Sequence, residues 1–121
     1  MYASAGYLAF EVHQHLDEDS SGTSPTCAGA DVGAQRMKPF TDWLRAHRKK
    51  GFLGEFSAGG GATCEKAIAG LLAHLEANKD VYVGWTYWAA GPAWGDYFAS
   101  IEPKGGKDRP QLAALLAHLR R

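Results

Sequence analysis

Segments typical of β-strands alternate three times with segments typical of α-helices along this chain. This order is the strongest constraint on how the chain can fold. Runs rich in β-branched and aromatic residues favour strands, and apolar residues that recur every three or four positions favour amphipathic helices. The predicted strands are 7–16, 52–56 and 81–88, and the predicted helices are 31–50, 64–78 and the segment that begins at Pro110. Such alternation predicts an α/β fold whose parallel strands are joined by right-handed crossovers.

Length limits how much of such a fold the chain can form. With 121 residues it is too short for a complete eight-stranded (β/α) barrel, which typically needs about 250 residues. Apolar residues make up 45% and charged residues 21% of the chain, as in an ordinary globular domain. No internal repeat, linker or low-complexity tract divides the sequence. We therefore expect residues 1–121 to form a single partial domain.

The charge balance argues against two classes of partner. Thirteen Lys and Arg residues balance thirteen Asp and Glu residues, so neither nucleic acid nor an anionic membrane is an expected partner.

The longest apolar stretches are shorter than the roughly 20 residues that a bilayer span needs. Residues 1–6 lack the charged and apolar regions of a signal peptide. We expect either that the chain is not exported or that a leader has been removed.

Each predicted helix has one apolar face that should pack on a core. These faces consist of Phe40, Trp43, Leu44 and His47 in the first helix, of Ala67, Ile68, Leu71, Leu72 and Leu75 in the second, and of Leu112, Leu115, Leu116 and Leu119 in the third. Pro39 lacks a backbone donor, so it should kink or restart the first helix. Gly51 is expected to end that helix.

Groups able to take part in chemistry lie at the predicted carboxyl ends of the strands, where parallel α/β folds collect functional groups. Glu55 ends the second strand among apolar neighbours, where a carboxylate is costly to bury unless it is hydrogen-bonded, paired or reactive. The alternative is that Glu55 simply reaches solvent from the strand tip. His13 and His15 share one strand face and could act as hydrogen-bond donors, proton carriers or metal ligands. Because no third ligand with a metal-binding spacing accompanies them, no metal site is predicted.

Two further pairs of residues lie in the loops that follow the strands. Trp88 and Trp94 fall where the chain leaves the third strand, and their flat faces could stack on sugar rings. The other aromatic residues around that strand are expected to pack in the core. Cys27 and Cys64 follow the first and second strands. They could form a disulfide in an exported protein or remain two unrelated thiols.

Three segments of the sequence together show a family resemblance. They are Phe10-Glu11-Val12-His13-Gln14-His15-Leu16-Asp17, Gly51-Phe52-Leu53-Gly54-Glu55-Phe56 and Trp88-Ala89-Ala90-Gly91-Pro92-Ala93-Trp94-Gly95-Asp96-Tyr97. In order and spacing they closely resemble the sixth, seventh and eighth barrel strands of glycoside hydrolase family 5, in particular of its secreted endo-β-1,4-glucanases. The resemblance extends from about Leu8 to the C-terminus. It implies a partial TIM-type (β/α) barrel with about three β/α units.

The resemblance also implies roles for individual residues. Glu55 matches the catalytic nucleophile of the family, and His13 matches the active-site histidine of the sixth strand. Trp88 matches the tryptophan that stacks beneath the sugar at the point of cleavage. Cys27 and Cys64 look like a disulfide of the family.

Two departures from the family pattern affect the catalytic groups. Where the family usually has His-x-Tyr, with the tyrosine hydrogen-bonded to the nucleophile, this chain has His15, so the role of the tyrosine is either lost or taken by an imidazole. The Asn-Glu-Pro segment that supplies the general acid/base is absent. Glu11 is expected to lie too deep to replace that residue. Asp17 and Asp96 should lie nearer the rim, with Asp17 as a substrate contact, and His15 could act as an acid near neutral pH.

The function implied by the resemblance is that of a retaining glycosidase on β-1,4-glucan, an endoglucanase or cellulase, without a cofactor and located outside the cell. Such enzymes need two carboxyl groups about 5 Å apart. A three-stranded piece exposes the edges of its outer strands, so we expect a homo-oligomer that covers these edges and could combine carboxyl groups from different chains. The alternative is a catalytically incomplete barrel fragment that only binds glucan.

Overall fold

The computed structural model describes residues 8–119, and its elements follow the predicted order. Strand β1 (Ala9–His15), helix α1 (Val32–Ala46), strand β2 (Lys50–Ser57), helix α2 (Ala62–Ala77), strand β3 (Tyr82–Trp85), the short 3₁₀ helix η2 (Pro92–Trp94) and helix α3 (Pro110–Leu116) succeed one another along the chain. The first predicted strand began at residue 7, which lies outside the described residues. No helix within residues 8–119 is long and apolar enough to cross a bilayer.

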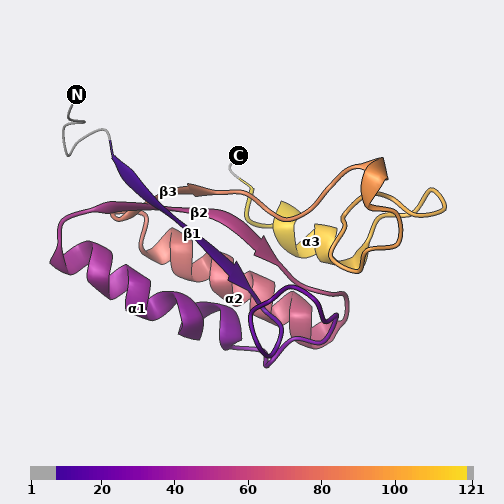
Figure 1. The fold of residues 1–121 in the computed structure, drawn as a ribbon, viewed down its shortest axis with the longest axis horizontal. Coiled ribbons are helices and arrows are strands. Elements are labelled where there is room, and N and C mark those ends of the chain that lie inside the picture. Colours follow the sequence, from indigo (N-terminus) through magenta and orange to yellow (C-terminus); the bar gives the residue numbers. More distant parts are fainter. Residues whose placement is uncertain (1–7, 120–121) are drawn as a thin grey trace.

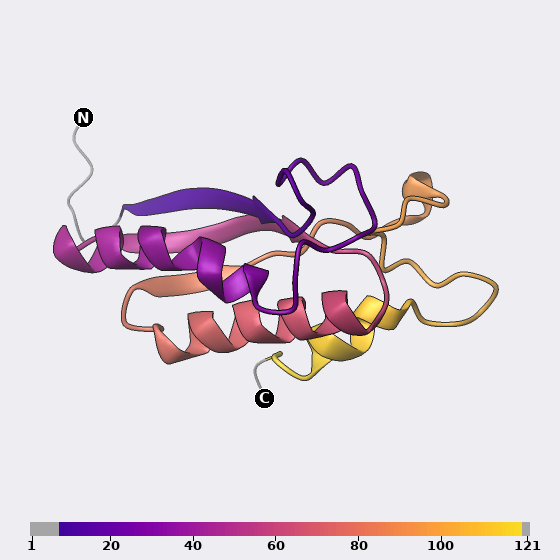
Figure 2. The ribbon, with the colours of Figure 1, turned by 90° about the horizontal axis from the view of Figure 1, so that it is seen from below.

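The three strands form one parallel sheet in the order β1-β2-β3, which confirms the predicted α/β class. Figure 1 shows α1 and α2 below the strands, and Figure 2, turned by 90°, shows the loops that follow the strands gathered at one end of the sheet. Both helices therefore cover the same sheet face. No described element packs over the opposite face of the sheet.

The third strand is shorter than predicted, but backbone pairing continues beyond it. The predicted strand 81–88 is reduced to Tyr82–Trp85. Beyond its end, the N–H of Thr86 donates to the carbonyl of Leu53, and the N–H of Trp88 donates to that of Phe56. These two bonds hold the start of the following loop against the carboxyl end of β2.

A β-bulge in β2 decides which way Glu55 faces. Val12 is paired with Leu53, but the next residue of β1, His13, is paired with Glu55, so that Gly54 is an extra residue in β2. Side chains alternate along a strand, and regular alternation would place Glu55 on the same face as Leu53, which is in the core. The bulge places Glu55 on the opposite face, together with His13. A Cβ atom at Gly54 would collide with the Glu11 carboxylate, so only glycine fits there without a shift.

The core lies between the sheet and the two long helices. The predicted apolar face of the second helix is confirmed, because all five of its residues are buried in α2. Leu53 and Phe56 from β2 and Leu44 and Met37 from α1 are completely or almost completely buried against this face. Burial of this kind is the main source of stability for a small domain.

The predicted apolar face of the first helix is only partly correct. Leu44 is buried and Phe40 packs against the core, but Trp43 is 39% exposed and its ring stacks on His47. The reason is that a different face of α1, which includes Thr41, is turned toward α2. Pro39 does not restart the helix, since α1 continues through it to Ala46. Gly51 does not end the helix either, because β2 already begins at Lys50.

The prediction for the third helix is wrong for two of its four leucines. Leu115 is buried, but Leu116 and Leu119 are 51% and 49% exposed. Of the other helices and strands, α2 is the one against which the short helix α3 mainly packs. Gln111 is buried there instead, and its amide donates hydrogen bonds to the carbonyls of Ala58 and Phe98.

Cys27 and Cys64 form a disulfide with a Cα–Cα distance of 5.4 Å. This confirms one of the two alternatives left open by the sequence. The bond connects the loop after β1 to the first turn of α2 across a sequence separation of 37 residues. Closing a loop of this length in the unfolded chain typically contributes about 2–4 kcal/mol to stability.

A buried polar network joins α1, α2 and β3. The Thr41 hydroxyl donates to the carbonyl of Met37, and it lies 2.7 Å both from His74 Nε2 and from the Tyr82 hydroxyl. With that donor committed, the hydroxyl oxygen of Thr41 accepts from the other two groups. Burial lowers the pKa of His74, as do the charges of Lys38 and Arg45, so His74 is a neutral donor in this network.

We predict that Gly54→Ala destabilises the fold by about 1–3 kcal/mol, because the new methyl group forces the Glu11 side chain or the bulge to move. The measurement is the free energy of unfolding in urea. Gly70→Ala is the matched control, since a Cβ atom at this helical position meets nothing within 4 Å and should stabilise α2 by roughly 0.5–1 kcal/mol. Equal effects of the two substitutions would contradict the assigned role of the bulge.

We also predict that His74 makes stability depend on pH. Its pKa is lower in the folded state than its ordinary value of 6.5, so the folded state binds fewer protons. The stabilisation is complete above pH 6.5 and is lost as the pH falls through the lowered pKa. The free energy of unfolding should therefore fall more steeply below pH 6.5 in the wild type than in His74→Gln. Parallel pH curves for the two proteins would refute this prediction.

Candidate active site

Strands β1 and β2 bring five polar side chains together near their carboxyl ends. The Glu55 carboxylate lies between two imidazoles, with Oε1 2.7 Å from His15 Nε2 and Oε2 3.5 Å from His13 Nδ1. The contacts continue on both sides, since His13 Nε2 is 2.6 Å from Glu11 Oε1 and His15 Nδ1 is 2.5 Å from the Ser57 hydroxyl. We call these five residues, Glu11, His13, Glu55, His15 and Ser57, the Glu55 cluster.

Exposure changes along the Glu55 cluster. The side chains of Glu11 and His13 are about half exposed, at 50% and 53%, whereas those of Glu55 and His15 are 21% and 12% exposed. Glu55 is thus neither a core residue nor a freely solvated strand tip. Its carboxylate can be approached from the His13 side and is held from the His15 side.

Ser57 was not singled out from the sequence, although a signal existed. It is two residues after Glu55 in β2 and therefore lies on the same strand face. The parallel register pairs it with His15. Its side chain is almost completely buried, so the hydroxyl is directed at the imidazole rather than at solvent.

The structure places Asp17 inside its loop and not at an open rim, which corrects its expected place as a substrate contact. Only 3% of the residue is exposed. Its carboxylate accepts hydrogen bonds from the backbone N–H groups of Gly22, Thr23 and Ser24 and from the Ser21 hydroxyl. Burial acts to raise the pKa of Asp17, but these hydrogen bonds outweigh it and hold the pKa below its usual value. Asp17 therefore orders the loop that follows β1.

A second residue missed by sequence reasoning, Arg36 of α1, fixes the start of the same loop. Its guanidinium group donates hydrogen bonds to the backbone carbonyls of His15, Asp17 and Glu18. Arginine carries five donors in a fixed plane, so one side chain can satisfy several carbonyls at the end of β1. The signal was weak, because an arginine on a helix is usually solvated.

The two candidate stacking residues lie together at the start of the loop after β3. Trp88 and Trp94 are 36% and 37% exposed, and their rings meet edge to face with centroids 4.8 Å apart. Tyr97 packs against Trp94, and its hydroxyl donates to the carbonyl of Gly22. The loops after β1 and β3 are thus tied together beside the end of β2. Apolar ring faces remain open to solvent there.

The remaining aromatic residues of the third strand pack as expected. Trp85 and Tyr87 both meet the ring of the buried Phe56 edge to face. The Tyr87 hydroxyl donates to the carbonyls of Ala58 and Ala99. Burial raises the pKa of Tyr87 far above its usual value, so it is a structural donor.

The carboxylates considered as partners for Glu55 lie elsewhere. Glu11 is half exposed and not deep, because the sheet face that bears it is uncovered, and the His13 ring separates it from Glu55. Asp96 is 83% exposed and pairs with Lys104 at 2.6 Å. Within residues 8–119, no group of three or more His, Cys, Asp and Glu residues is arranged to hold a metal ion.

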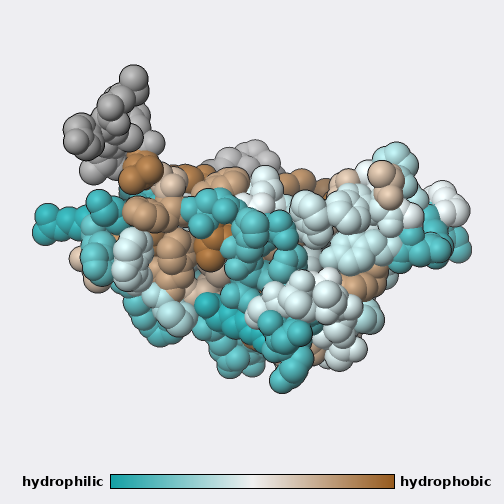
Figure 3. All heavy atoms as spheres, in the orientation of Figure 1, coloured by the Kyte–Doolittle hydropathy of each residue, from teal (hydrophilic) through white to brown (hydrophobic). Residues whose placement is uncertain are grey.

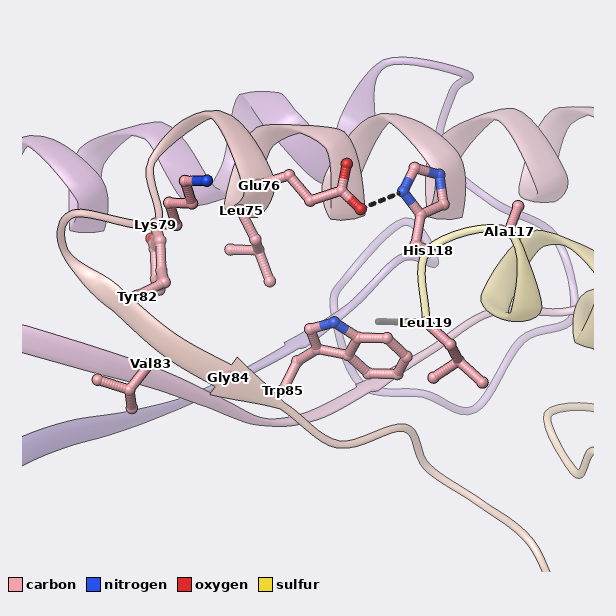
Figure 4. A pocket seen from close by; sticks show the side chains of 10 residues that line it. All are labelled: Leu75, Glu76, Lys79, Tyr82, Val83, Gly84, Trp85, Ala117, His118 and Leu119. Carbon is pink, nitrogen blue, oxygen red and sulfur yellow. Dashed lines mark hydrogen bonds and ion pairs between the residues drawn. The ribbon is translucent and has the colours of Figure 1, made fainter. Parts of the chain in front are cut away.

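One cavity lies away from the Glu55 cluster. It measures about 570 Å³ and lies between β3, the C-terminal end of α2 and the segment after α3. Figure 4 shows Leu75 and Trp85 directed into it, with the ion pair of His118 and Glu76 at 2.8 Å on its far side. The cavity opens beside the unpaired edge of β3, whereas the Glu55 cluster lies on the uncovered sheet face.

Comparison with known proteins gives a consistent result. The family model for cellulase, glycosyl hydrolase family 5, matches residues 4–91. Endoglucanase gh5-1 of Neurospora crassa is 54% identical over 109 residues, which are 90% of this chain and 28% of that protein. Endoglucanase 3 of Humicola insolens is 50% identical over 99 residues, which are 82% of this chain and 26% of that protein.

Solved structures give the same result for the fold. An endo-β-1,4-glucanase of Xanthomonas axonopodis pv. citri superposes with a TM-score of 0.87 at 48% identity and covers 91% of this chain and 36% of its own. XacCel5A in complex with cellopentaose gives a TM-score of 0.87 at 47% identity, with coverage of 92% and 36%. The three β/α units correspond to part of a TIM barrel, and the chain spans about a quarter to a third of the relatives' length. By this match over most of its length, the chain belongs to glycosyl hydrolase family 5, the cellulase family.

Proposed function

We propose that this chain supplies the nucleophile side of a retaining endo-β-1,4-glucanase site, with Glu55 as the nucleophile. The observation that carries the proposal is the position of the Glu55 carboxylate, which is 21% exposed at the carboxyl end of a parallel strand, 2.7 Å from the His15 imidazole and 3.5 Å from that of His13. Two similar proteins are named endoglucanases, and a similar structure contains cellopentaose. A β-1,4-glucan is therefore the substrate class that we assign.

The proposed reaction divides into two displacements. A carboxylate oxygen of Glu55 attacks the anomeric carbon, the bond from that carbon to the leaving oxygen breaks, and the leaving oxygen takes a proton from a general acid. Water then attacks the anomeric carbon of the glycosyl-enzyme, loses a proton to the same residue and releases Glu55. In this proposal His13 contacts the sugar from the exposed side of the carboxylate, and Trp88 and Trp94 stack on it.

The general acid of this reaction is not found beside Glu55 within residues 8–119. We propose that association with other chains completes the site and that a homo-oligomer forms. Two physical features support association: the outer edges of β1 and β3 are unpaired within the described residues, and apolar side chains lie exposed near them. Val83 is 61% exposed and Leu8 44%, and Figure 3 shows hydrophobic atoms gathered where β1 begins.

One observation favours a second candidate function, in which the chain binds glucan without cleaving it. Trp88 and Trp94 present more than a third of their surface to solvent, whereas no second carboxylate contacts Glu55 among the described residues. In that case Trp88→Ala should weaken binding of a cello-oligosaccharide, since stacking is lost, and Glu55→Gln should leave its affinity nearly unchanged.

We also assign the protein to an oxidising compartment outside the cytoplasm. A disulfide such as Cys27–Cys64 persists in secreted proteins and is rare in the reducing cytosol. Export would also bring the protein to polysaccharide, which is too large to enter a cell.

The nucleophile is tested with 2,4-dinitrophenyl β-cellobioside, whose leaving group departs without protonation. The wild-type chain should release dinitrophenolate with a burst that approaches one equivalent per chain, because only the attacking carboxylate is needed. Glu55→Gln should abolish the burst. Glu65→Gln, in the first turn of α2, is the matched control and should retain it. A burst that survives in Glu55→Gln would contradict the assignment, whereas binding of cello-oligosaccharide without any burst would support the binding function.

Association is tested by light scattering on the purified chain. We predict a mass above the 13.0 kDa of one chain, and we predict that Val83→Glu on β3 lowers it by placing a charge at the exposed edge. Ala73→Glu on the exposed side of α2 is the control and should leave the mass unchanged. A wild-type monomer at all accessible concentrations would exclude the homo-oligomer, and hydrolysis of carboxymethyl cellulose by that monomer would exclude the need for any partner.

A further inference from the structure

The imidazole of His15 is held at both nitrogens. Nε2 lies 2.7 Å from the Glu55 carboxylate and Nδ1 lies 2.5 Å from the Ser57 hydroxyl. The ring is 12% exposed. Gly22 of the following loop packs on it so closely that an added Cβ atom would lie 2.8 Å from Nδ1. Little room is left at Nδ1 for a partner other than Ser57.

The hydrogen atoms of this arrangement follow from the acceptor and donor capacities of each group. An ionised carboxylate can only accept, so Nε2 must carry the proton in the bond to Glu55. In a neutral imidazole Nδ1 is then an acceptor, and the hydroxyl of Ser57 must donate to it. The order of donation is Ser57 to His15 to Glu55.

We infer that Ser57 donates to Nδ1 of His15, whose tautomer the Glu55 carboxylate fixes, and that the two residues act together as positioning residues for that carboxylate. The inference rests on the proposed role of Glu55 as nucleophile. With Oε1 held by His15, Oε2 remains on the exposed side, where it faces His13 at 3.5 Å. Oε2 is therefore the oxygen presented to the anomeric carbon, and the carboxylate keeps one orientation through the reaction.

The pairing explains how an imidazole can take the place of a tyrosine hydroxyl. A phenol donates one hydrogen bond through its hydroxyl and has no other polar atom to satisfy. An imidazole has two ring nitrogens, and either of them can be the donor. The opposite tautomer would place a bare nitrogen against the Glu55 carboxylate, and two acceptors would repel each other. The carboxylate therefore excludes that tautomer, and the Ser57 hydroxyl satisfies the bare Nδ1 that remains.

Of the charged and titratable groups that the structure describes around His15, only the Glu55 carboxylate contacts its ring. Glu55 faces Nε2 from β2, His13 flanks the other carboxylate oxygen, and Glu11 contacts His13. The Arg36 guanidinium approaches only the backbone carbonyl of His15, and the Asp17 carboxylate is saturated by its own loop. A second proton on Nδ1 would require the buried Ser57 hydroxyl to turn away from the ring.

The test is long-range ¹H–¹⁵N correlation NMR of the ¹⁵N-histidine-labelled chain at pH 7 to 8, which reads the tautomer without any turnover. In the wild type we expect His15 to have a protonated Nε2 and a bare Nδ1 that is shifted by hydrogen bonding. In Ser57→Ala the Nδ1 resonance should move toward that of a free bare nitrogen. In Ser57→Thr, which retains the hydroxyl, it should return toward the wild-type position.

The resonances of His47, an exposed histidine at the end of α1, provide the check that the variants remain folded, since they should not change. A protonated Nδ1 in the wild type, or an Nδ1 resonance that does not respond to Ser57→Ala, would overturn the inference. Failure of the dinitrophenolate burst with these NMR results intact would instead count only against the role of Glu55 in catalysis. Where the burst is present, Ser57→Ala should slow it severalfold and Ser57→Thr should restore it.

Discussion

The register between β1 and β2 is the constraint on which the site depends. Parallel pairing sets the two strand ends side by side, but regular alternation alone would turn Glu55 toward the helices, where an unpaired carboxylate is costly. The extra residue at Gly54 reverses its direction and aligns Glu55 with His13. Bulges often occur next to active sites, where they direct a side chain differently from its neighbours. A methyl group at this position would meet the Glu11 side chain, which would then have to move.

Hydrogen bonds and a disulfide around the site hold the loops that follow the strands in place. The buried Asp17 carboxylate orders the loop after β1, Arg36 fixes the first carbonyls of that loop, and the Cys27–Cys64 disulfide ties its end to α2. Tyr97 then joins the loop after β3 to it. These interactions explain how long polar loops can keep Trp88 and Trp94 beside the carboxyl end of β2.

The sequence allowed the element order, the parallel α/β class and the core face of α2 to be predicted, because their signals are local and periodic. The residues at the strand ends were found in the same way, and the disulfide as one of two alternatives. Predictions failed where packing beyond the local pattern decides the outcome, as for Trp43 and Leu116, which face solvent. Asp17 was misplaced because a loop's hydrogen bonds cannot be read from residue types. Ser57 and the bulge at Gly54 were missed because both depend on the register between two strands 40 residues apart.

We propose that this register makes Glu55 the carboxylate that attacks the substrate. Covalent trapping with 2-deoxy-2-fluoro-β-cellobiosyl fluoride tests this role, because fluoride leaves without an acid while the fluorine at C2 slows release of the sugar. We predict one sugar per chain, attached to the peptide that contains Glu55. Attachment to Glu11 or another carboxylate, or no attachment under conditions in which the chain binds cello-oligosaccharide, would contradict this account.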